Sequence, residues 1–538
     1  MKALFIIIWM LCFCIMSTSY GCNSTPARKP AKVTVNHIDT LIKGNFNSAS
    51  QLKFDSTSIA IFLQKHPGLK DFADEYAKFY TINKHRYVWY DGKGLTESAS
   101  NLINHLNIQQ SDGILKAIPY KKEFLNLTDS IHNSESKKPL INFELMLTGQ
   151  YFNYAKNVWG GAEAEKAGSM GWYLPRKKLS YTDLLDHNLK SGADSVEQTA
   201  VIPQYIMLKK ALNRYQQIEK SQADILLPSG SKLNLLLPRD TSALLIKLKN
   251  RLRQLGDLTE SDLSNTYDTV LIKAVKRFKE RHGITPDSKL NNIFIKQLNI
   301  PLHKRIEQMI VNLERMRWIP ADDHGGEFLL VNIPEFKLHY YINNRPDWAC
   351  NVVVGKAMTK TVIFSGHLQY IVFSPYWYIP PSIIKKEIKP GMARNPNYLA
   401  NHNMDWNGGN VRQKPGITNS LGLVKFIFPN SNNIYLHDTP SKSLFNEDVR
   451  AFSHGCIRVA KPKELATRIL KQNPVWTSQK IDAAMHAGRE QTVVLKKKMP
   501  VYIGYFTAFV TSEGLLNFRE DIYNRDASLL NLLMQTSK

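Results

Sequence analysis

The sequence predicts a multidomain α+β protein, in which a β-rich domain follows a mostly helical region and a small helical module. Three observations support this prediction. The chain has 538 residues, more than one hydrophobic core usually serves, so two to four domains are expected. Between residues 46 and 235, apolar side chains recur with the 3.6-residue spacing of amphipathic helices. After residue 325, short β-branched and aromatic runs bounded by Pro, Gly and Asn indicate strands.

The N-terminus has the form of an export signal. Lys2 is followed by an apolar run from Ala3 to Met16, which is too short to span a bilayer comfortably, and small or polar residues come next. Residues 1–21 are therefore predicted to be a signal peptide. The polar stretch 22–45 is expected to be a tether.

A lipid anchor is predicted at Cys22. The sequence "SYGC" at 19–22 resembles a bacterial lipobox, whose final cysteine is acylated after cleavage. Ser19 departs from that pattern, which prefers an aliphatic residue there. Ordinary signal cleavage and an uncleaved anchor therefore stay open beside lipidation. In each case we expect the protein in the periplasm or cell envelope.

Cysteine usage argues against a disulfide framework and against zinc. If Cys12 and Cys14 leave with the signal and Cys22 carries lipid, only Cys350 and Cys456 remain in the folded body. No second cysteine or histidine lies at C-x-x-C or H-x-x-x-H spacing near Cys456. We expect neither a metal nor a cofactor. An unpaired thiol kept in an exported protein calls for a reason.

The chain is strongly basic, with a formal net charge of +24 from 70 Lys and Arg against 46 Asp and Glu. Such a balance attracts polyanions. Export argues against nucleic acid, and a cell wall or membrane surface rich in carboxylate or phosphate is the expected partner. For any single lysine, a solvated basic surface is an equally good interpretation. The protein is expected to be a monomer.

The helical half is predicted to contain two parts and a link. Residues 46–235 show no catalytic constellation and are interpreted as a scaffold domain. Residues 241–300 carry three short amphipathic helices and resemble a peptidoglycan-binding module through "RL..LG", "AV..F...HG" and a terminal "LN". Ser288 stands directly after Asp287, where that module usually has a glycine. Residues 301–325 are predicted to be a linking helix.

The β-rich domain is predicted to span residues 326–511, with 512–538 as a C-terminal tail. Its apolar runs include "FLLVNI", "CNVVVG", "LQYIVF" and "NIYLH". Residues 380–415 are rich in Pro, Asn, Gly and Lys and interrupt the strands. Because a long stretch without regular pattern is more often functional than idle, a lid over a cleft is one interpretation.

A candidate site lies around "AFSHGCIRV" at 451–459. Cys456 would attack as a thiolate and needs a base, which His437 could supply at the end of a predicted strand. The 19 intervening positions allow a loop to leave one strand and return alongside it. Gly455 would let backbone amides approach an oxyanion, and Arg458 would share a face with Cys456 in extended chain. From spacing alone, a buried structural cysteine is favoured.

The longer string changes this balance. "VRQKPGITNSLGLVKFIFPNSNNIYLHDTPSKSLFNEDVRAFSHGCIRV" (411–459) resembles the L,D-transpeptidase catalytic domain, in which a histidine, some fifteen residues and Ser/Thr-His-Gly-Cys follow one another. The resemblance extends to "PYWYIPPSI" (375–383) and "PVYIGYFTAFV" (500–510). The helical region and module in front resemble the large periplasmic members of this family. Arg458 stands where many members have asparagine, and a subgroup shares the arginine.

The resemblance implies that Cys456 is the nucleophile and His437 the base. The Asp438 backbone is expected to orient His437. Tyr435 lies on the same strand face as His437, and either an oxyanion contact or simple packing fits it. Cys350, in an apolar strand, is expected to be inert.

Three further motif members, Ser453, His454 and Gly455, have roles that the sequence does not separate, although His454 is expected to be structural or supportive. The implied substrates are peptidoglycan stem peptides, joined in 3→3 cross-links through a Cys456 thioester, and carbapenem-type β-lactams are implied to acylate the same thiol. Three alternatives stay open: an L,D-carboxypeptidase that trims tetrapeptides, a transpeptidase that anchors a protein to the wall, and, more remotely, a non-catalytic wall-binding lipoprotein.

Overall fold

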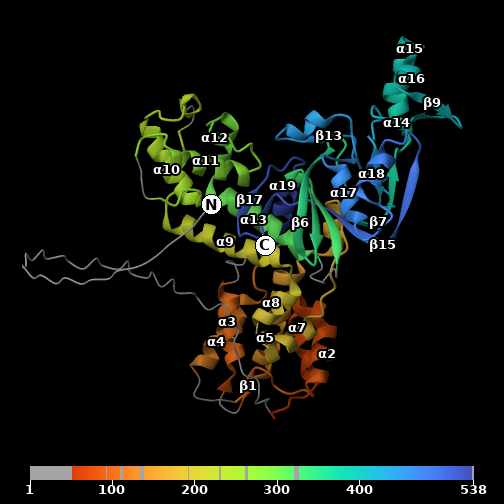
Figure 1. Ribbon diagram of the computed structural model, residues 1–538. Coiled ribbons are helices and arrows are strands. Elements are labelled where there is room, and N and C mark those ends of the chain that lie inside the picture. The colour runs from red at the N-terminus through yellow and green to blue at the C-terminus, as the bar shows by residue number, and fades with distance from the viewer. Residues whose placement is uncertain are drawn as a thin grey trace, which may run out of the picture. The chain divides into compact units, whose positions relative to one another are not determined.

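A computed structural model describes residues 51–91, 94–108, 113–133, 138–191, 193–228, 232–260, 264–319 and 326–535. The predicted signal peptide, the Cys22 lipid site and the 22–45 tether lie outside these residues. The described residues all belong to one compact unit, Leu41–Lys538. Its elements are labelled in Figure 1.

The N-terminal region is mostly helical, as predicted. Its centre is α5 (Ile141–Ala155), which is apolar and buried on nearly every side, as expected of a core helix. Helices α1, α3, α4 and α7 pack against α5. The elements of this region are α1 (Thr57–Lys65), η1 (Pro67–Phe72), α2 (Ala73–Ile82), β1 (Tyr90–Asp91), β2 (Gly94–Leu95), α3 (Glu97–Ile108), α4 (Lys121–His132), α5, η3 (Lys156–Gly160), α6 (Ala164–Ser169), β3 (Trp172–Tyr173), α7 (Tyr181–Ser191), α8 (Ala193–Ala200), α9 (Pro203–Ser221) and η4 (Lys232–Leu235).

Three helices follow where the sequence predicted them: α10 (Ala243–Leu255), α11 (Thr269–Arg281) and α12 (Asn292–Leu298). Each begins at a side-chain cap, because Ser242, Asp268 and Asn291 accept a hydrogen bond from the helix's own backbone. The three helices are therefore confirmed, and their identity as a peptidoglycan-binding module stays a prediction.

Helix α13 (Leu302–Arg317) occupies the predicted linking segment, but it is a core element rather than a linker. Most of its residues are buried, and it packs against α9, against α19 (Asp526–Gln535) and against β16 (Ala508–Val510). Polar side chains on α13 form hydrogen bonds with the C-terminal segment. The Gln308 amide, for example, donates to the carbonyls of Thr507 and Arg519 at 3.0 and 2.9 Å. The helix thus joins the N-terminal helices to the C-terminal strands.

The C-terminal half is β-rich, as predicted, and its main sheet closes on itself. The strands pair in the order β11, β12, β14, β6, β5, β4, β15, β7, and β7 pairs again with β11. The two-residue turn between β5 and β6 is Asn343–Asn344, both at positive φ, as a tight hairpin requires. The strands of the barrel are β4 (Glu327–Asn332), β5 (Lys337–Ile342), β6 (Arg345–Gly355), β7 (Ile363–Phe373), β11 (Val424–Ile427), β12 (Leu436–His437), β14 (Ile457–Val459) and β15 (Gln491–Gly504).

Shorter elements surround this barrel. They are η5 (Ile333–Glu335), η7 (Lys442–Asn446), β13 (Ala451–Ser453), which pairs with β6, α17 (Pro462–Ile469) and α18 (Ser478–Met485). Within the described residues, no helix has the length and apolar character needed to cross a membrane.

Two segments outside the predicted β-rich domain also complete it. Strand β3, from the predicted scaffold, pairs in parallel with the start of β7, Trp172 opposite Ile363. The predicted tail contains β17 (Leu516–Phe518), which pairs with β16, and α19. The β3–β7 pairing and the packing of α19 on α13 join residues far apart in the sequence, which local patterns do not reveal.

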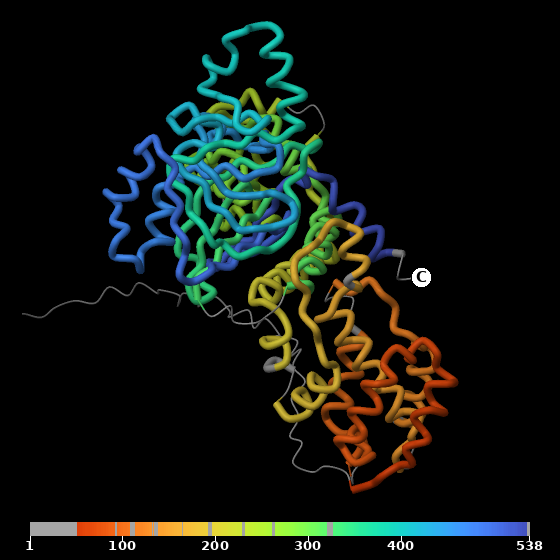
Figure 2. The backbone as a smooth tube through the Cα atoms, turned by 90° about the vertical axis from the view of Figure 1, so that its right-hand side faces the viewer, coloured from red at the N-terminus to blue at the C-terminus, as the bar shows by residue number. Residues whose placement is uncertain are grey.

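The predicted 380–415 insertion has regular structure, although its composition suggested none. It contains α14 (Pro381–Ile383), η6 (Ile384–Ile388), α15 (Lys389–Arg394), α16 (Tyr398–Asn401), β9 (Met404–Asn407) and β10 (Asn410–Gln413), and the last two form a small sheet with β8 (Trp377–Tyr378). A separate apolar cluster that includes Ile384, Ile388 and Val411 holds it together. In Figures 1 and 2 this segment projects from the barrel strands.

Candidate active site

Strands β12 and β14 bring the two candidate catalytic residues together. They pair in parallel, with His437 opposite Arg458, and the Ile457 amide donates to the Tyr435 carbonyl at 3.1 Å. Cys456, just before β14, therefore lies beside the chain that carries His437. The chain does return alongside the first strand, as the spacing suggested.

The His437 ring is held in one orientation by its neighbour. It is buried, and its Nδ1 lies 2.5 Å from the Asp438 carbonyl oxygen. A carbonyl only accepts, so Nδ1 carries the proton and Nε2 is left as the unprotonated nitrogen. Burial, followed by the charge of Arg458, lowers the pKa of His437 to about 3. The ring is thus neutral at pH 7, and its Nε2 can accept a proton.

The Asp438 side chain holds its own backbone in place, and the carbonyl of that backbone is the group that orients His437. Its carboxylate accepts from the Leu423 and Thr439 amides at 2.9 and 2.7 Å and pairs with Lys442. Gly422 makes room for it: φ is +61°, and a Cβ there would lie 2.4 Å from the carboxylate carbon. The sequence analysis passed over Gly422, because nothing local marks a glycine that a distant carboxylate requires.

The Cys456 thiol is half-buried and lies among polar groups. Its Sγ donates to the Asn433 carbonyl at 3.6 Å. Burial raises the pKa of Cys456, while hydrogen bonds from Tyr435 and the charge of Arg458 oppose that rise. The structure shows no direct hydrogen bond between the side chains of His437 and Cys456. In enzymes without bound substrate, hydrogen bonds between catalytic residues are often long.

Tyr435 lies near both candidate catalytic residues. Burial and the Cys456 thiol both raise the pKa of its phenol, through charge and through a side-chain hydrogen bond. Its ring lies edge-on to His437, with 5.7 Å between centroids. Trp377 of β8 also bonds the phenol, a contact that the sequence did not predict.

Arg458 places a positive charge beside both catalytic candidates. Burial lowers its own pKa, and the Cys456 thiol opposes that effect. Its Nε is buried and has no hydrogen-bond partner in the part of the chain that the structure describes. The side chain as a whole is only half-buried, and a guanidinium at such a position can bind a carboxylate.

The remaining motif members shape the turn before Cys456. Ser453 Oγ donates to the Cys456 carbonyl at 2.6 Å and accepts from the Gly455 amide at 3.1 Å. Gly455 has φ +122°, a region that other residues rarely adopt. His454 points elsewhere, with Nε2 3.6 Å from Glu387 Oε1 of the insertion. The supportive role expected of His454 stays a prediction.

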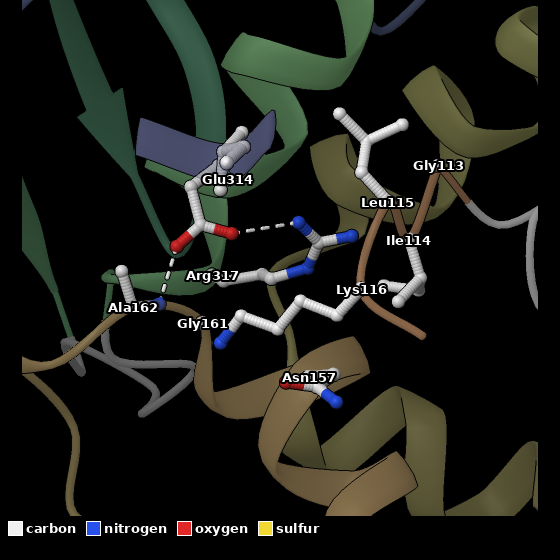
Figure 3. Close-up of a pocket in the computed structure, with 10 residues that line it drawn as sticks. Gly113, Ile114, Leu115, Lys116, Asn157, Gly161, Ala162, Glu314 and Arg317 are labelled. Carbon is white, nitrogen blue, oxygen red and sulfur yellow. Dashed lines mark hydrogen bonds and ion pairs between the residues drawn. The ribbon is translucent and has the colours of Figure 1, made fainter. Parts of the chain in front are cut away.

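Two other features lie apart from this site. Cys350 is buried in β6, and burial raises the pKa of its thiol to about 12, which makes it unreactive. A small cavity is lined by Lys116, Asn157, Glu314 and Arg317 among others, none of them in the motif (Figure 3). There Glu314 accepts from Arg317 Nη1 and from the Ala162 amide, so these hydrogen bonds hold α13 against the segment that follows η3. Among the described residues, no three His, Cys, Asp or Glu side chains are grouped as metal ligands.

Two family models match this chain. Residues 326–477 match the YkuD family, described as the L,D-transpeptidase catalytic domain, and they include the whole site above. The chain carries an L,D-transpeptidase catalytic domain. Residues 74–212 match the Scaffold domain, within the helical region predicted as a scaffold. The resemblance stated from the sequence is thereby confirmed.

Individual relatives agree over part of the chain. The Haemophilus influenzae protein named "Putative L,D-transpeptidase" is 33% identical over 244 residues, which are 41% of this chain and about half (49%) of the relative. Two solved structures are described as L,D-transpeptidases. The one from Xylanimonas cellulosilytica is 12% identical, covers 52% of this chain and 100% of its own, and gives a TM-score of 0.19. The one from Stackebrandtia nassauensis is 13% identical, covers 51% of this chain and 98% of its own, and gives a TM-score of 0.22. Scores this low carry no argument.

Proposed function

We propose that this protein is a cysteine L,D-transpeptidase that forms 3→3 cross-links between peptidoglycan stem peptides. One observation carries the proposal: His437, with Nδ1–H bonded to the Asp438 carbonyl, offers its free nitrogen on the strand beside Cys456. A thiol next to an oriented base is the arrangement that nucleophilic acyl transfer needs. The catalytic-domain match supports the same chemistry.

In the first half-reaction, the Cys456 sulfur attacks the carbonyl carbon between residues three and four of a donor stem, and His437 Nε2 takes the thiol proton. The carbonyl becomes a tetrahedral oxyanion. The carbon–nitrogen bond then breaks, His437 returns the proton to the departing amine, and the terminal D-amino acid leaves. A Cys456 thioester of the shortened stem remains.

In the second half-reaction, the side-chain amine of a diamino acid on a neighbouring stem attacks the thioester. His437 takes a proton from that amine, the new amide forms, and the Cys456 sulfur leaves and is reprotonated. The pKa of Cys456 is raised and that of His437 is lowered, so the resting pair is neutral thiol and neutral imidazole. Proton transfer therefore accompanies attack.

Arg458 and Tyr435 are proposed to assist. The half-buried guanidinium of Arg458 would receive a carboxylate of the donor stem, and its charge would favour the thiolate as it forms. The Tyr435 phenol, which bonds the thiol in the resting state, would steady the sulfur during attack. The Cys456 amide is the proposed oxyanion donor.

The acceptor decides between related activities. Water in place of the amine would make the enzyme a carboxypeptidase, and an amine on a protein would make it a wall-anchoring enzyme. Exclusion of water from the thioester favours transfer to an amine. The insertion around Glu387, which faces His454 of the motif, is the proposed cover. Export, membrane anchorage through Cys22, acylation by carbapenems and action as a monomer belong to the same proposal.

The test is product analysis after the full chain is incubated with purified disaccharide-tetrapeptide. We expect a dimer that has lost one terminal D-amino acid, formed by the wild type and by Cys350→Ala but not by a folded Cys456→Ala variant. Tripeptide monomer alone would favour the carboxypeptidase. A Cys456→Ala variant with unimpaired turnover would overturn the assignment, and no product from any form would favour a wall-binding protein.

A further inference from the structure

Thr361, which precedes β7, holds the catalytic turn from outside the motif. It is completely buried. Its Oγ1 donates to the Gly455 carbonyl at 2.9 Å and accepts from the Gly355 amide at 2.9 Å. Both roles of the hydroxyl are therefore used, and one of them is on the peptide that joins Gly455 to Cys456.

That peptide also carries the Cys456 N–H. Because a peptide unit is planar and trans, its N–H points opposite to its C=O, so a bond that fixes the Gly455 oxygen also aims the Cys456 N–H. Within the described chain this N–H has no hydrogen-bond acceptor, which leaves it for an oxyanion. Gly455 at φ +122° is in a conformation that glycine adopts readily and other residues rarely do, so the direction of this peptide depends on the bonds that hold it.

Tyr523 holds Thr361 in turn. Its hydroxyl accepts from the Thr361 amide at 3.2 Å and donates to the Gly355 carbonyl at 2.5 Å. The Tyr523 amide donates to Tyr505 Oη at 2.9 Å, which ties the segment to the end of the barrel. Tyr523 lies in the stretch predicted as a C-terminal tail, so that stretch supports the site.

We propose that Thr361 is a positioning residue that aims the Cys456 N–H at the oxyanion of the reacting acyl group, and that Tyr523 keeps Thr361 in place. The inference rests on the proposed function, since it assigns the groups that direct its oxyanion donor. Thr361 and Tyr523 touch neither substrate nor sulfur. They act through one peptide bond.

Two reactions of the Cys456 thiol separate this role from simple stability. Acylation by a carbapenem passes through a tetrahedral oxyanion, whereas alkylation by iodoacetamide is a direct displacement without one. Both rates are measured on the full chain, in the Cys350→Ala background, by intact-protein mass. Thr361→Val is compared with Thr361→Ser, which keeps the hydroxyl. Thr128→Val, which removes a buried hydroxyl in α4 bonded to the Phe124 carbonyl at 2.8 Å, is the control.

We expect Thr361→Val to acylate about tenfold or more slowly, because small misplacements of catalytic groups cost rates of that order. Alkylation should stay at the wild-type rate, and Thr361→Ser and Thr128→Val should acylate within about twofold of wild type. Tyr523→Phe, with Tyr76→Phe as its buried control, gives a second variant if Thr361→Val does not fold, and we expect acylation about threefold slower. The hydroxyl removed from Tyr76 donates to the Leu145 carbonyl at 2.7 Å.

Wild-type acylation in Thr361→Val, or an equal fall in both reactions, would overturn the positioning role. Failure of the wild-type protein to acylate at all, with its thiol still open to alkylation, would instead overturn the proposed function, and this inference with it.

Discussion

Two buried titratable side chains, Glu144 in the helical region and His437 in the barrel, show how a structural polar group differs from the proposed catalytic base. Burial pushes both toward the neutral form: the pKa of Glu144 rises to about 7, and that of His437 falls to about 3. Glu144 accepts from the Val88 amide, the Trp89 amide and Tyr80 Oη at 2.8, 3.2 and 2.9 Å. His437 has one hydrogen bond, from Nδ1.

The two groups differ in whether an acceptor atom is left without a hydrogen bond. Both Glu144 oxygens are occupied by donors of the fold, so nothing remains for a substrate. The His437 ring is fixed through one nitrogen, and its other nitrogen has no hydrogen bond to the described residues. The strand that carries it runs beside the chain of Cys456. Burial and a shifted pKa therefore do not by themselves distinguish a candidate catalytic group from a structural one, and the unoccupied nitrogen of His437 is what sets it apart from Glu144.

The largest expected effect is on turnover. His437→Gln should lower carbapenem acylation and cross-linking by about 10³-fold or more, because the base is lost. Glu144→Gln should leave the acylation rate of folded protein within about twofold. Intact-protein mass against time measures both. Equal losses in the two variants would erase the distinction between the groups.

Stability should respond in the opposite order. Glu144→Ala leaves the two amides and the Tyr80 hydroxyl without their buried acceptor, so we expect the free energy of unfolding to fall by about 3 kcal/mol. His437→Gln should cost about 1 kcal/mol, because only one internal hydrogen bond is involved. Urea unfolding followed by circular dichroism checks this. A Glu144→Ala protein as stable as wild type would contradict the structural role.

The pH dependence of stability should separate the two groups by sign. The pKa of His437 is about 3 folded against 6.5 ordinarily, so its contribution to stability is lost as pH falls below 6.5. The pKa of Glu144 is about 7 folded against 4.5, so its contribution is present at low pH and lost as pH rises through 7. From pH 7 to pH 5, each contribution changes by about 2 kcal/mol, in opposite directions.

Variants reveal each contribution as a difference from wild type. Over that pH range, His437→Gln should gain about 2 kcal/mol relative to wild type, and Glu144→Gln should lose about 2 kcal/mol. Unfolding at the two pH values measures both differences, and other titrating groups cancel. Parallel curves for all three proteins would mean that neither side chain titrates as the structure indicates.

Local patterns in the sequence predicted the α+β division, the three helices α10–α12 and the return of the chain that carries Cys456 alongside the strand of His437. They did so because helix periodicity, strand composition and a contiguous motif are all recorded within short stretches. The irregular composition of 380–415 was misleading, because a few apolar residues such as Ile384 and Val411 suffice for a small core.

What the sequence missed depends on contacts between distant segments. Gly422 is required by a carboxylate sixteen positions away, Thr361 reaches the motif from the loop before β7, and β3 joins the barrel from the scaffold. Tyr523 is separated from its partner Gly355 by 168 positions. Such residues have ordinary local surroundings, and only the closed barrel brings them together.

The most direct measurement is peptide mapping of the acid-quenched enzyme after incubation of the full-length Cys350→Ala protein with a tetrapeptide donor and no acceptor amine. A mass added to the peptide that contains Cys456, equal to the mass of the donor stem less that of the free terminal D-amino acid, is the predicted result. It should be absent from His437→Gln. Donor consumption with Cys456 unmodified at every time point, or a stem attached to another residue, would contradict a Cys456 thioester as the intermediate.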